Sequence, residues 1–255
     1  MRFITAWRTD IGLKKKTNQD SMLILEAETD HGQVLLAAVC DGMGGLAKGE
    51  VASAAAIRAL SEWFKQELPK LLRSGITENS FRQSLTSLLE QTNKRLGSYG
   101  KHTGIHLGTT VVALLIVADR YYIVNVGDSR AYSITNTMLQ ITKDQTLVQQ
   151  EMDAGRMTAE EAYRDPRRSV LLQCIGASEE IKPDFYFGFI QPNENFLLCC
   201  DGFRHVISND EFFAGLNTSV AHAEREMGEN IQYFIDLNKY RRETDNISAL
   251  LVHVC

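Results

Sequence analysis

Short apolar runs rich in β-branched and aromatic residues predict the strands of this chain. The runs cover residues 21–27, 33–40, 109–118, 121–126, 195–200 and 247–254. Most of them are apolar at successive positions and do not alternate with polar residues, which indicates strands buried on both faces.

Two longer segments carry apolar residues at helical spacing, and they predict a helical hairpin over residues 46–72 and 77–96. The expected buried face of the first helix consists of Val51, Ala55, Leu60, Phe64, Leu68 and Leu71. That of the second consists of Phe81, Leu85, Leu88, Thr92 and Leu96. Residues 220–237 predict a further helix, and residues 144–163 predict one or two short helices broken at Gly155.

Strands and helices occur in blocks and not in strict alternation, which favours an α+β fold over a doubly wound parallel sheet. No low-complexity linker or internal repeat divides the 255 residues, and only four are proline. A chain of this length can bury one large core. We therefore expect residues 1–255 to form a single domain.

Charge and cysteine content exclude several classes of function. The net charge is −5, so neither nucleic acid nor an anionic membrane surface is expected as a partner. The five cysteines show no zinc-site spacing, and we interpret Cys40, Cys199 and Cys200 as reduced, buried, hydrophobic side chains. Because the N-terminus lacks the apolar stretch of a signal peptide, we expect a cytoplasmic protein.

Aspartates stand at the ends of the predicted strands. Asp41, Asp128 and Asp201 each follow one, whereas Asp20 and Asp245 each precede one. If neighbouring strands are antiparallel, the end of one lies beside the start of the next, so all five carboxylates gather at one rim. Such a cluster would repel itself strongly unless cations were bound. Oxygen ligands without His or Cys suit Mg²⁺ or Mn²⁺ better than Zn²⁺.

An Asp-Gly pair after a strand most often marks a turn, so each of these signals is weak alone. Their order along the chain is far more specific. The ordered motifs are Asn18-Gln19-Asp20, Asp41-Gly42-Met43-Gly44-Gly45, Gly108-Thr109-Thr110, Val126-Gly127-Asp128-Ser129-Arg130, Asp201-Gly202 and Asp245-Asn246-Ile247. Gly42, Gly44 and Gly45 would let the backbone approach a metal or a phosphate closely.

These motifs resemble those of the metal-dependent serine/threonine protein phosphatases (the PPM or type 2C family), in the small bacterial form, over nearly the whole chain. The resemblance implies two antiparallel sheets packed as a sandwich and flanked by helices, in four layers. It also implies two Mn²⁺ or Mg²⁺ ions at one edge. The implied reaction is hydrolysis of phosphoserine and phosphothreonine in proteins by direct attack of a hydroxide that bridges the metals.

The resemblance assigns a role to each motif residue. Asp41 would bridge the two metals, and the Gly42 carbonyl would bind one of them. Asp201 and Asp245 would bind the other metal. Asp20 would orient water, and Asp128 with Asp201 would hold a third, weaker metal.

The chain also departs from the family pattern. Lys15 stands where the family usually has an arginine that binds substrate phosphate, and we assign Lys15 this role as a hypothesis. Gln145 stands where a histidine is common, and Gln19 where a glutamate is frequent. His205 follows Asp201 closely, but we interpret it as a helix-capping or surface histidine.

Residues 145–168 match the variable flap beside the family's cleft, where Arg164, Arg167 and Arg168 would be either solvated or in contact with a phosphoprotein. We expect a monomer whose substrates come from a cognate serine/threonine kinase. Two alternatives stay open. One is a pseudophosphatase that binds phosphoproteins without turnover, and the other is a metal-dependent nuclease or nucleotidase.

Overall fold

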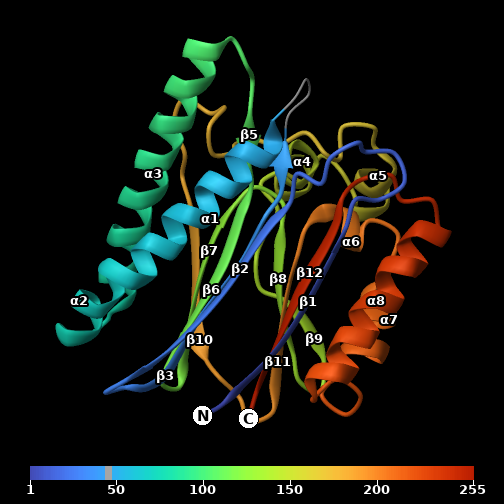
Figure 1. Ribbon diagram of the computed structural model, residues 1–255. Helices are drawn as coiled ribbons and strands as arrows, with labels where there is room; N and C mark the ends of the chain where they lie inside the picture. The colour runs from blue at the N-terminus through green and yellow to red at the C-terminus, as the bar shows by residue number, and fades with distance from the viewer. Residues whose placement is uncertain (44–47) are drawn as a thin grey trace.

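The computed structural model describes residues 1–43 and 48–255, and it places two antiparallel sheets face to face between groups of helices (Figure 1). Gly44 and Gly45 of the predicted glycine-rich motif lie outside the described residues. The same holds for Leu46, where the first helix was expected to begin.

The first sheet contains both ends of the chain. Its strand order is β1 (Phe3–Asp10), β12 (Ile247–Val254), β11 (Glu194–Cys199), β8 (Arg130–Ile134) and β9 (Met138–Gln140). The N-terminal strand β1 pairs along its whole length with the last strand, from Phe3 opposite Val254 to Asp10 opposite Ile247.

The second sheet is built from the middle of the chain and from β2. Its strand order is β10 (Asp184–Phe189), β7 (Arg120–Val126), β6 (Val111–Val117), β3 (Gly32–Cys40) and β2 (Ser21–Thr29). Two short strands, β4 (Gly42–Met43) and β5 (Gly108–Thr109), form a separate pair beside it. Every pairing in the three sheets is antiparallel, which is the condition under which the predicted aspartates gather at one rim.

Helices cover the outer face of each sheet (Figure 1). The second sheet carries α1 (Gly49–Gln66), α2 (Leu68–Arg73) and α3 (Glu78–Thr103). The first sheet carries α6 (Asp201–Arg204), α7 (Asn209–Leu216) and α8 (Glu224–Tyr240). The predicted α+β sandwich of four layers is therefore confirmed. No helix in the described part of the chain is long and apolar enough to cross a membrane.

Strand β3 is buried on both faces, and its side chains contribute to two hydrophobic clusters. Leu35, Ala37 and Val39 belong to the cluster that fills the space between the sheets. Their neighbours Leu36 and Ala38 belong to a second cluster beneath α1 and α3. Because successive side chains of a strand point to opposite faces, a run that is apolar at every position is what this place in the fold requires.

The helical hairpin is confirmed, with two changes. The first predicted helix is divided, because α1 ends at Gln66 and α2 begins at Leu68 with Pro69, whose missing N–H suits the first turn of a new helix. The fully buried face of α1 includes Ala52 and Ala56, whereas the predicted Val51 and Ala55 lie beside it and are partly buried.

The second predicted helix, α3, runs seven residues beyond its expected end at Leu96 and stops at Thr103. Gly104 follows in the left-handed conformation, with φ 69°, which a glycine adopts without strain. The two short helices around Gly155 are α4 (Leu147–Asp153) and α5 (Ala159–Arg164), as predicted.

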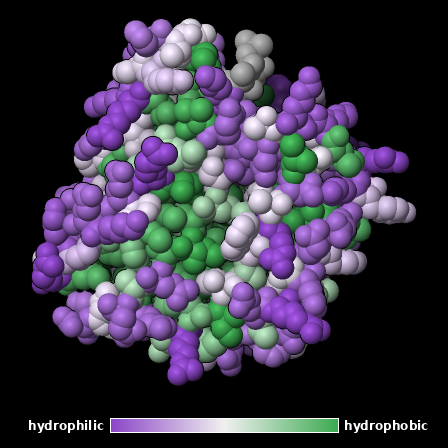
Figure 2. Space-filling model, viewed as in Figure 1, coloured by the Kyte–Doolittle hydropathy of each residue, from purple (hydrophilic) through white to green (hydrophobic). Residues whose placement is uncertain are grey.

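Besides the two-residue strands β4 and β5, four strands of the described residues were not predicted: β1, β8, β9 and β10. They are short or alternate polar with apolar residues, and β1, β9 and β10 lie at sheet edges, where one side of the strand has no neighbour in its sheet. At the other edge of the second sheet, β2 has partly buried apolar side chains at Met22, Leu23, Ile24 and Leu25. Figure 2 shows apolar residues gathered on the face where Figure 1 places β2.

The packing of α3 on the second sheet generates a stability prediction. Phe81 is 2% exposed, and its ring lies 5.9 Å from that of Trp63 and 5.3 Å from that of Tyr122, centroid to centroid. Phe81→Ala should lower the free energy of unfolding by about 3–5 kcal/mol, because it leaves a cavity at this contact.

Urea unfolding of the parent protein and the variant measures the change. Tyr240→Ala is the control, since Tyr240 is 83% exposed and its loss should change stability by less than about 0.5 kcal/mol. Equal effects of the two substitutions would contradict the proposed core contact.

Candidate metal centre

Two carboxylates of the second sheet meet where β2 begins and β3 ends. Asp20 directly precedes β2, and Asp41 directly follows β3. The antiparallel register places Ser21 opposite Cys40, so the residues just outside this pair are neighbours as well. The expectation that strand ends gather these two aspartates is confirmed by the geometry.

The first sheet contributes in the same way. Asp201 is the first residue of α6, just after β11, and Asp245 lies two residues before β12. The two strands are antiparallel neighbours, and Cys200 N donates to Ser248 O at 3.1 Å. Asp128 arrives at the same rim from the turn between β7 and β8.

A cavity of about 240 Å³ opens at this rim. Of the seven residues predicted for the site, six line it: Lys15, Asp41, Gly42, Asp128, Asp201 and Asp245. Asp20 is not in its lining but lies behind it, beside Asp41. The structure therefore brings all seven together, and their individual roles stay predictions.

The backbone of Asp41 is held by the predicted Gly-Thr-Thr motif. Thr110 Oγ1 accepts from Asp41 N at 2.9 Å, and Thr110 N donates to Asp41 O at 2.9 Å. Thr109 Oγ1 donates to the same carbonyl oxygen at 3.0 Å. With its backbone fixed from both sides, Asp41 directs its carboxylate toward the cavity.

Gly42 is required by close packing of backbone. A Cβ at this position would lie 2.3 Å from Gln19 O and 2.4 Å from Gly49 O, which is closer than any real contact. Gly49, at the start of α1, would clash with Gly42 in the same way. The two glycines thus bring α1 against β4 and place the helix beside the rim.

Asn246 ties the loop that carries Lys15 to the last strand. Its Nδ2 donates to Ile11 O at 2.9 Å and to Thr17 O at 3.3 Å, and its Oδ1 accepts from Gln19 N at 2.9 Å. These bonds hold both ends of the loop. As a result, Lys15 faces the cavity although its loop contains no helix or strand.

Burial and mutual repulsion perturb the carboxylates. Burial, with the nearby carboxylates of Asp201 and Asp245, raises the pKa of Asp20 to about 7. Burial and the charges of Asp20 and Asp201 raise the pKa of Asp41 well above its usual range. Burial and Asp201 also raise the pKa of Asp128 to about 7. These are the shifts expected of anions that lack enough positive charge nearby.

Several oxygen atoms in the cluster are buried and have no hydrogen-bond partner. Among the described residues, both carboxylate oxygens of Asp20 and Oδ1 of Asp201 are in this state, and the side chains of Ser248 and Cys200 act on Asp20 only as weak donors that lower its pKa. Buried polar atoms are normally paired, so such orphans indicate a missing partner. Because all of them are acceptors, divalent cations fit this donor set.

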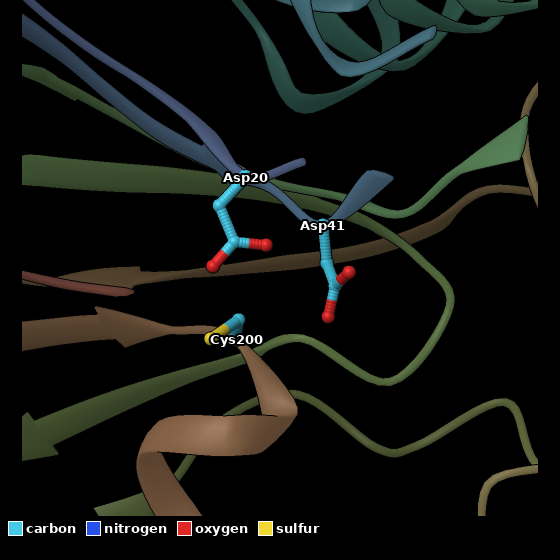
Figure 3. A group of neighbouring side chains, drawn as sticks. All are labelled: Asp20, Asp41 and Cys200. Carbon is cyan, nitrogen blue, oxygen red and sulfur yellow. The ribbon is translucent and has the colours of Figure 1, made fainter. Parts of the chain in front are cut away.

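One close group within the cluster includes a cysteine. Asp20, Asp41 and Cys200 each offer a ligand atom, and these atoms lie within 4.8 Å of one another (Figure 3). Sequence reasoning missed Cys200 because it was interpreted only as a buried hydrophobic side chain. The available signal was its place directly before Asp201.

Lys15 is in the cavity and is paired with a carboxylate. Its Nζ lies 2.6 Å from Asp245 Oδ1. Burial by itself would lower the pKa of Lys15, but the bond to Asp245 and the charges of Asp41 and Asp201 outweigh it and raise the pKa. Lys15 is thus a charged ammonium within the cluster.

Asp128 has a cationic partner that was not predicted. Arg204 Nη2 donates to Asp128 O at 3.0 Å and lies 3.4 Å from Asp128 Oδ2 and 3.2 Å from Asp144 Oδ2. Arg130 grips Asp144 with two hydrogen bonds of 2.7 Å. Burial would raise the pKa of Asp144, but Arg204 and Arg130 outweigh it and lower the pKa. The sequence signal for this contact was the position of Arg204, which lies about one helical turn after Asp201.

His205 occupies the C-cap position of α6, as interpreted, but its ring is not on the surface. The side chain is 12% exposed, with Nε2 3.3 Å from Asp201 Oδ2 and Nδ1 3.3 Å from Glu243 Oε2. Burial would lower the pKa of His205, and the two carboxylates outweigh it and raise the pKa. His205 therefore orients Asp201 from behind.

The flap arginines have local partners. Arg164 pairs with Glu160, and Arg167 pairs with Asp165. The third, Arg168, lines a larger cavity of about 550 Å³ between the flap helices and α7. Carboxylates of that cavity, including Asp144 and Glu211, are in ion pairs. Its charges are therefore compensated, unlike those of the smaller cavity.

Comparison with known proteins agrees with this geometry. The serine/threonine phosphatase stp of Listeria welshimeri is 32% identical over 252 residues, which span 96% of this chain and 94% of that protein. The solved serine/threonine phosphatase of S. agalactiae has a TM-score of 0.85 and 28% identity, with 100% of each chain covered.

A second solved structure is the catalytic domain of the phosphatase PstP in complex with two manganese ions. It has a TM-score of 0.79 and 28% identity, and the match covers 98% of this chain and 97% of that one. The family model of protein phosphatase 2C matches residues 13–235. This chain belongs to the protein phosphatase 2C family.

Proposed function

We propose that this chain is a metal-dependent protein phosphatase that hydrolyses phosphoserine and phosphothreonine. The observation that carries the proposal is the cavity rimmed by carboxylates, with buried oxygens that lack partners. The relatives named above are serine/threonine phosphatases, and one of them binds two manganese ions. We assign two Mn²⁺ or Mg²⁺ ions to the cavity of this chain.

Four residues would hold these ions. Asp41 would contact both of them, because carboxylates of both sheets, including Asp20 and Asp201, act on it and its backbone is fixed by Thr109 and Thr110. Gly42 adds a carbonyl oxygen next to it, and Asp201 and Asp245 add carboxylates from the first sheet. Asp128 would hold a third ion only weakly, since Arg204 already offsets its charge.

When bound, such cations make a strong nucleophile of water at neutral pH and neutralise charge on the phosphate. The residues of the chain then have simple tasks. The unpartnered carboxylate oxygens of Asp20 accept hydrogen bonds from the attacking water and orient it toward the cavity. His205 holds the carboxylate of Asp201 through Oδ2, which would leave the unpartnered oxygen Oδ1 to a cation.

Lys15 would bind the substrate phosphate. Its ammonium reaches into the cavity, and the three N–H groups give it donors beyond the one directed at Asp245. A lysine offers a compact, hydrated charge on a flexible stem, without the planar fork with which arginine grips two oxygens. We therefore expect a looser hold on phosphate than an arginine would give.

Further expectations about partners and location stay predictions. They are a cognate kinase that produces the substrates, a monomeric state and a cytoplasmic location. The pseudophosphatase alternative is disfavoured because every predicted metal-binding position keeps its oxygen donor at the cavity. The nuclease alternative is disfavoured because the relatives named above are serine/threonine phosphatases.

The first prediction for this function concerns metal removal. Phosphatase activity on a phosphothreonine peptide should require Mn²⁺ or Mg²⁺ and vanish with excess EDTA, because water is too weak a nucleophile without metal. Added Mn²⁺ should also raise the melting temperature of the metal-free protein. At a Mn²⁺ concentration 100 times the dissociation constant, the free energy of unfolding should rise by about 2.7 kcal/mol.

A malachite green assay and a thermal melt measure the two effects. A dinucleotide is the matched substrate that separates a phosphatase from a nuclease. Full activity in EDTA would rule out the metal-dependent mechanism.

The second prediction concerns the carboxylates themselves. Asp41→Asn and Asp201→Asn should each lower kcat by at least the roughly 100- to 1,000-fold seen when one charge-stabilising group is removed. The metal-free variants should keep or gain stability. Folding raises the pKa of Asp41, so its carboxyl group ionises at a cost in the folded state and destabilises the metal-free protein at neutral pH. Replacing Asp201 removes a charge that repels the carboxylates of Asp20 and Asp41.

Asp30→Asn, in the exposed turn between β2 and β3, is the control for loss of one negative charge. Kinetics and urea unfolding in EDTA give both readouts. A fall in metal-free stability with unchanged metal affinity would mean that the two aspartates are structural turn residues.

The third prediction separates two roles of Lys15. If it binds phosphate, Lys15→Ala should raise KM for a small phosphoester more than it lowers kcat, because the contact exists before the transition state. Lys15→Arg should lower KM several-fold, by about 1 kcal/mol for an added charged hydrogen bond. Lys15→Ala should also reduce the Mn²⁺ concentration for half-maximal activity, since Nζ pairs with Asp245.

Lys14→Ala and Lys16→Ala are the matched controls on the same loop. Steady-state kinetics at several Mn²⁺ concentrations give both KM and the metal requirement. If the three alanine variants behave alike, Lys15 has no specific contact with phosphate.

A further inference from the structure

The larger cavity of the molecule, of about 550 Å³, lies between the flap helices α4 and α5 and the start of α7. It is separate from the metal centre, because among the described residues none lines both this cavity and the smaller one. Its volume is within the range of roughly 300–1,000 Å³ that is usual for sites of small molecules. The function proposed above makes no use of it.

The walls of this cavity are largely apolar. Val148 and Met152 come from α4, Ala162 from α5, and Ile207 from the segment before α7. Three of them, Val148, Ala162 and Ile207, are buried, and the flexible thioether of Met152 can adapt to the shape of a ligand. Tyr163 adds an aromatic ring that is 61% exposed. These walls suit a ligand with an apolar body.

One cationic side chain of the lining is left without an anionic partner. The carboxylates of Asp144 and Glu211 are held in ion pairs with other arginines. The guanidinium of Arg168, in contrast, donates to Tyr163 O at 3.3 Å, and no carboxylate in the described part of the chain pairs with it. An unpaired guanidinium beside an apolar wall favours a ligand that carries a negative charge.

We propose that this cavity binds a small organic anion with an apolar body, of the class of aromatic carboxylates and sulfonates. The apolar body lies between α4, α5 and Ile207, where it is removed from water. The anionic group accepts hydrogen bonds from Arg168, whose planar fork suits two oxygens at once. The proposal goes beyond the phosphatase function and does not rest on it.

The chain that follows Arg168 connects this cavity to the metal centre. Arg168 lines the larger cavity, whereas Ser169 and Leu171, directly after it, line the smaller one. Val170, between them, accepts a hydrogen bond from Leu147 N at the start of α4, at 2.9 Å. An anion held by Arg168 therefore fixes one wall of the metal cavity, and the larger cavity is an effector site for it.

The dye anilinonaphthalene sulfonate (ANS) is the probe for this site, because it joins a sulfonate to an aromatic body. Titration of the protein with ANS should give a fluorescence increase that saturates at one dye per chain. Hydrogen exchange measured with and without ANS should slow together in α4, α5 and α7, which the ligand bridges, and in the segment from Arg168 to Leu172.

Filling the cavity is the first test by substitution. Ala159 is exposed and lines the cavity, so the indole of Ala159→Trp should occupy the site of the dye and abolish the saturable binding. Ala154→Trp is the matched control, since Ala154 is an exposed alanine of the same flap outside the lining. Far-ultraviolet circular dichroism of each variant checks that it is folded.

Removing the charge is the second test. Arg168→Gln should weaken ANS binding by roughly 10-fold or more, which is the value of one charged hydrogen bond. The same variant should leave the binding of phenylnaphthylamine, an uncharged analogue of the dye, unchanged. Arg164→Gln is the matched control, because Arg164 pairs with Glu160 and lies outside the lining. It should bind both dyes as the parent protein does.

Three results would overturn the proposal. Dye bound to the partly buried apolar residues along β2 would keep its affinity in Ala159→Trp. Equal weakening of ANS and of its uncharged analogue by Arg168→Gln would show that the site selects no anion. Slowed exchange that leaves out α5 or α7 would place the dye elsewhere. All readouts are taken without a phosphorylated substrate, so failure here leaves the proposed function intact.

Discussion

The two sheets bring several aspartates to one rim, where they repel one another. This repulsion accounts for the cationic side chains around the cavity and for its capacity to bind cations. Asp20 and Asp41 come from one sheet and Asp201 and Asp245 from the other, and burial together with the surrounding charges raises the pKa values of Asp20 and Asp41. A fold that only maximised its stability would not place these groups together. Lys15, Arg204 and His205 each offset part of the charge, and the remainder is available to bound cations.

The gathering of these aspartates was predictable from the sequence, for a simple reason. A strand that is apolar at successive positions ends where the first charged residue appears, and antiparallel pairing then places neighbouring ends side by side. The same logic located the strands at the centre of each sheet. It located the edge strand β2, which carries a run of apolar residues, but not the edge strands β1 and β10 or the short inner strand β8, in which polar residues interrupt the apolar pattern.

The groups that modify the aspartates were harder to predict. Arg204 and His205 were visible in the sequence, but their contacts with Asp128 and Glu243 join residues 76 and 38 positions apart. Cys200 was treated as a hydrophobic residue because cysteine usually is one when buried. Only the structure shows that its sulfur lies within 4.8 Å of carboxylate oxygens of Asp20 and Asp41. Side-chain chemistry at a site depends on neighbours that no local pattern encodes.

The pairing of the first and last strands joins the two ends of the chain. Arg2 N donates to Cys255 O at 3.2 Å, and Cys255 N donates to Arg2 O at 3.0 Å. Asn246 then fastens the Lys15 loop to the same last strand. During synthesis, Asp20 and Asp41 leave the ribosome long before Asp201 and Asp245, which complete the cluster. The carboxylate cluster therefore stays incomplete in the nascent chain until β12 has emerged, and phosphatase activity is expected only after that point.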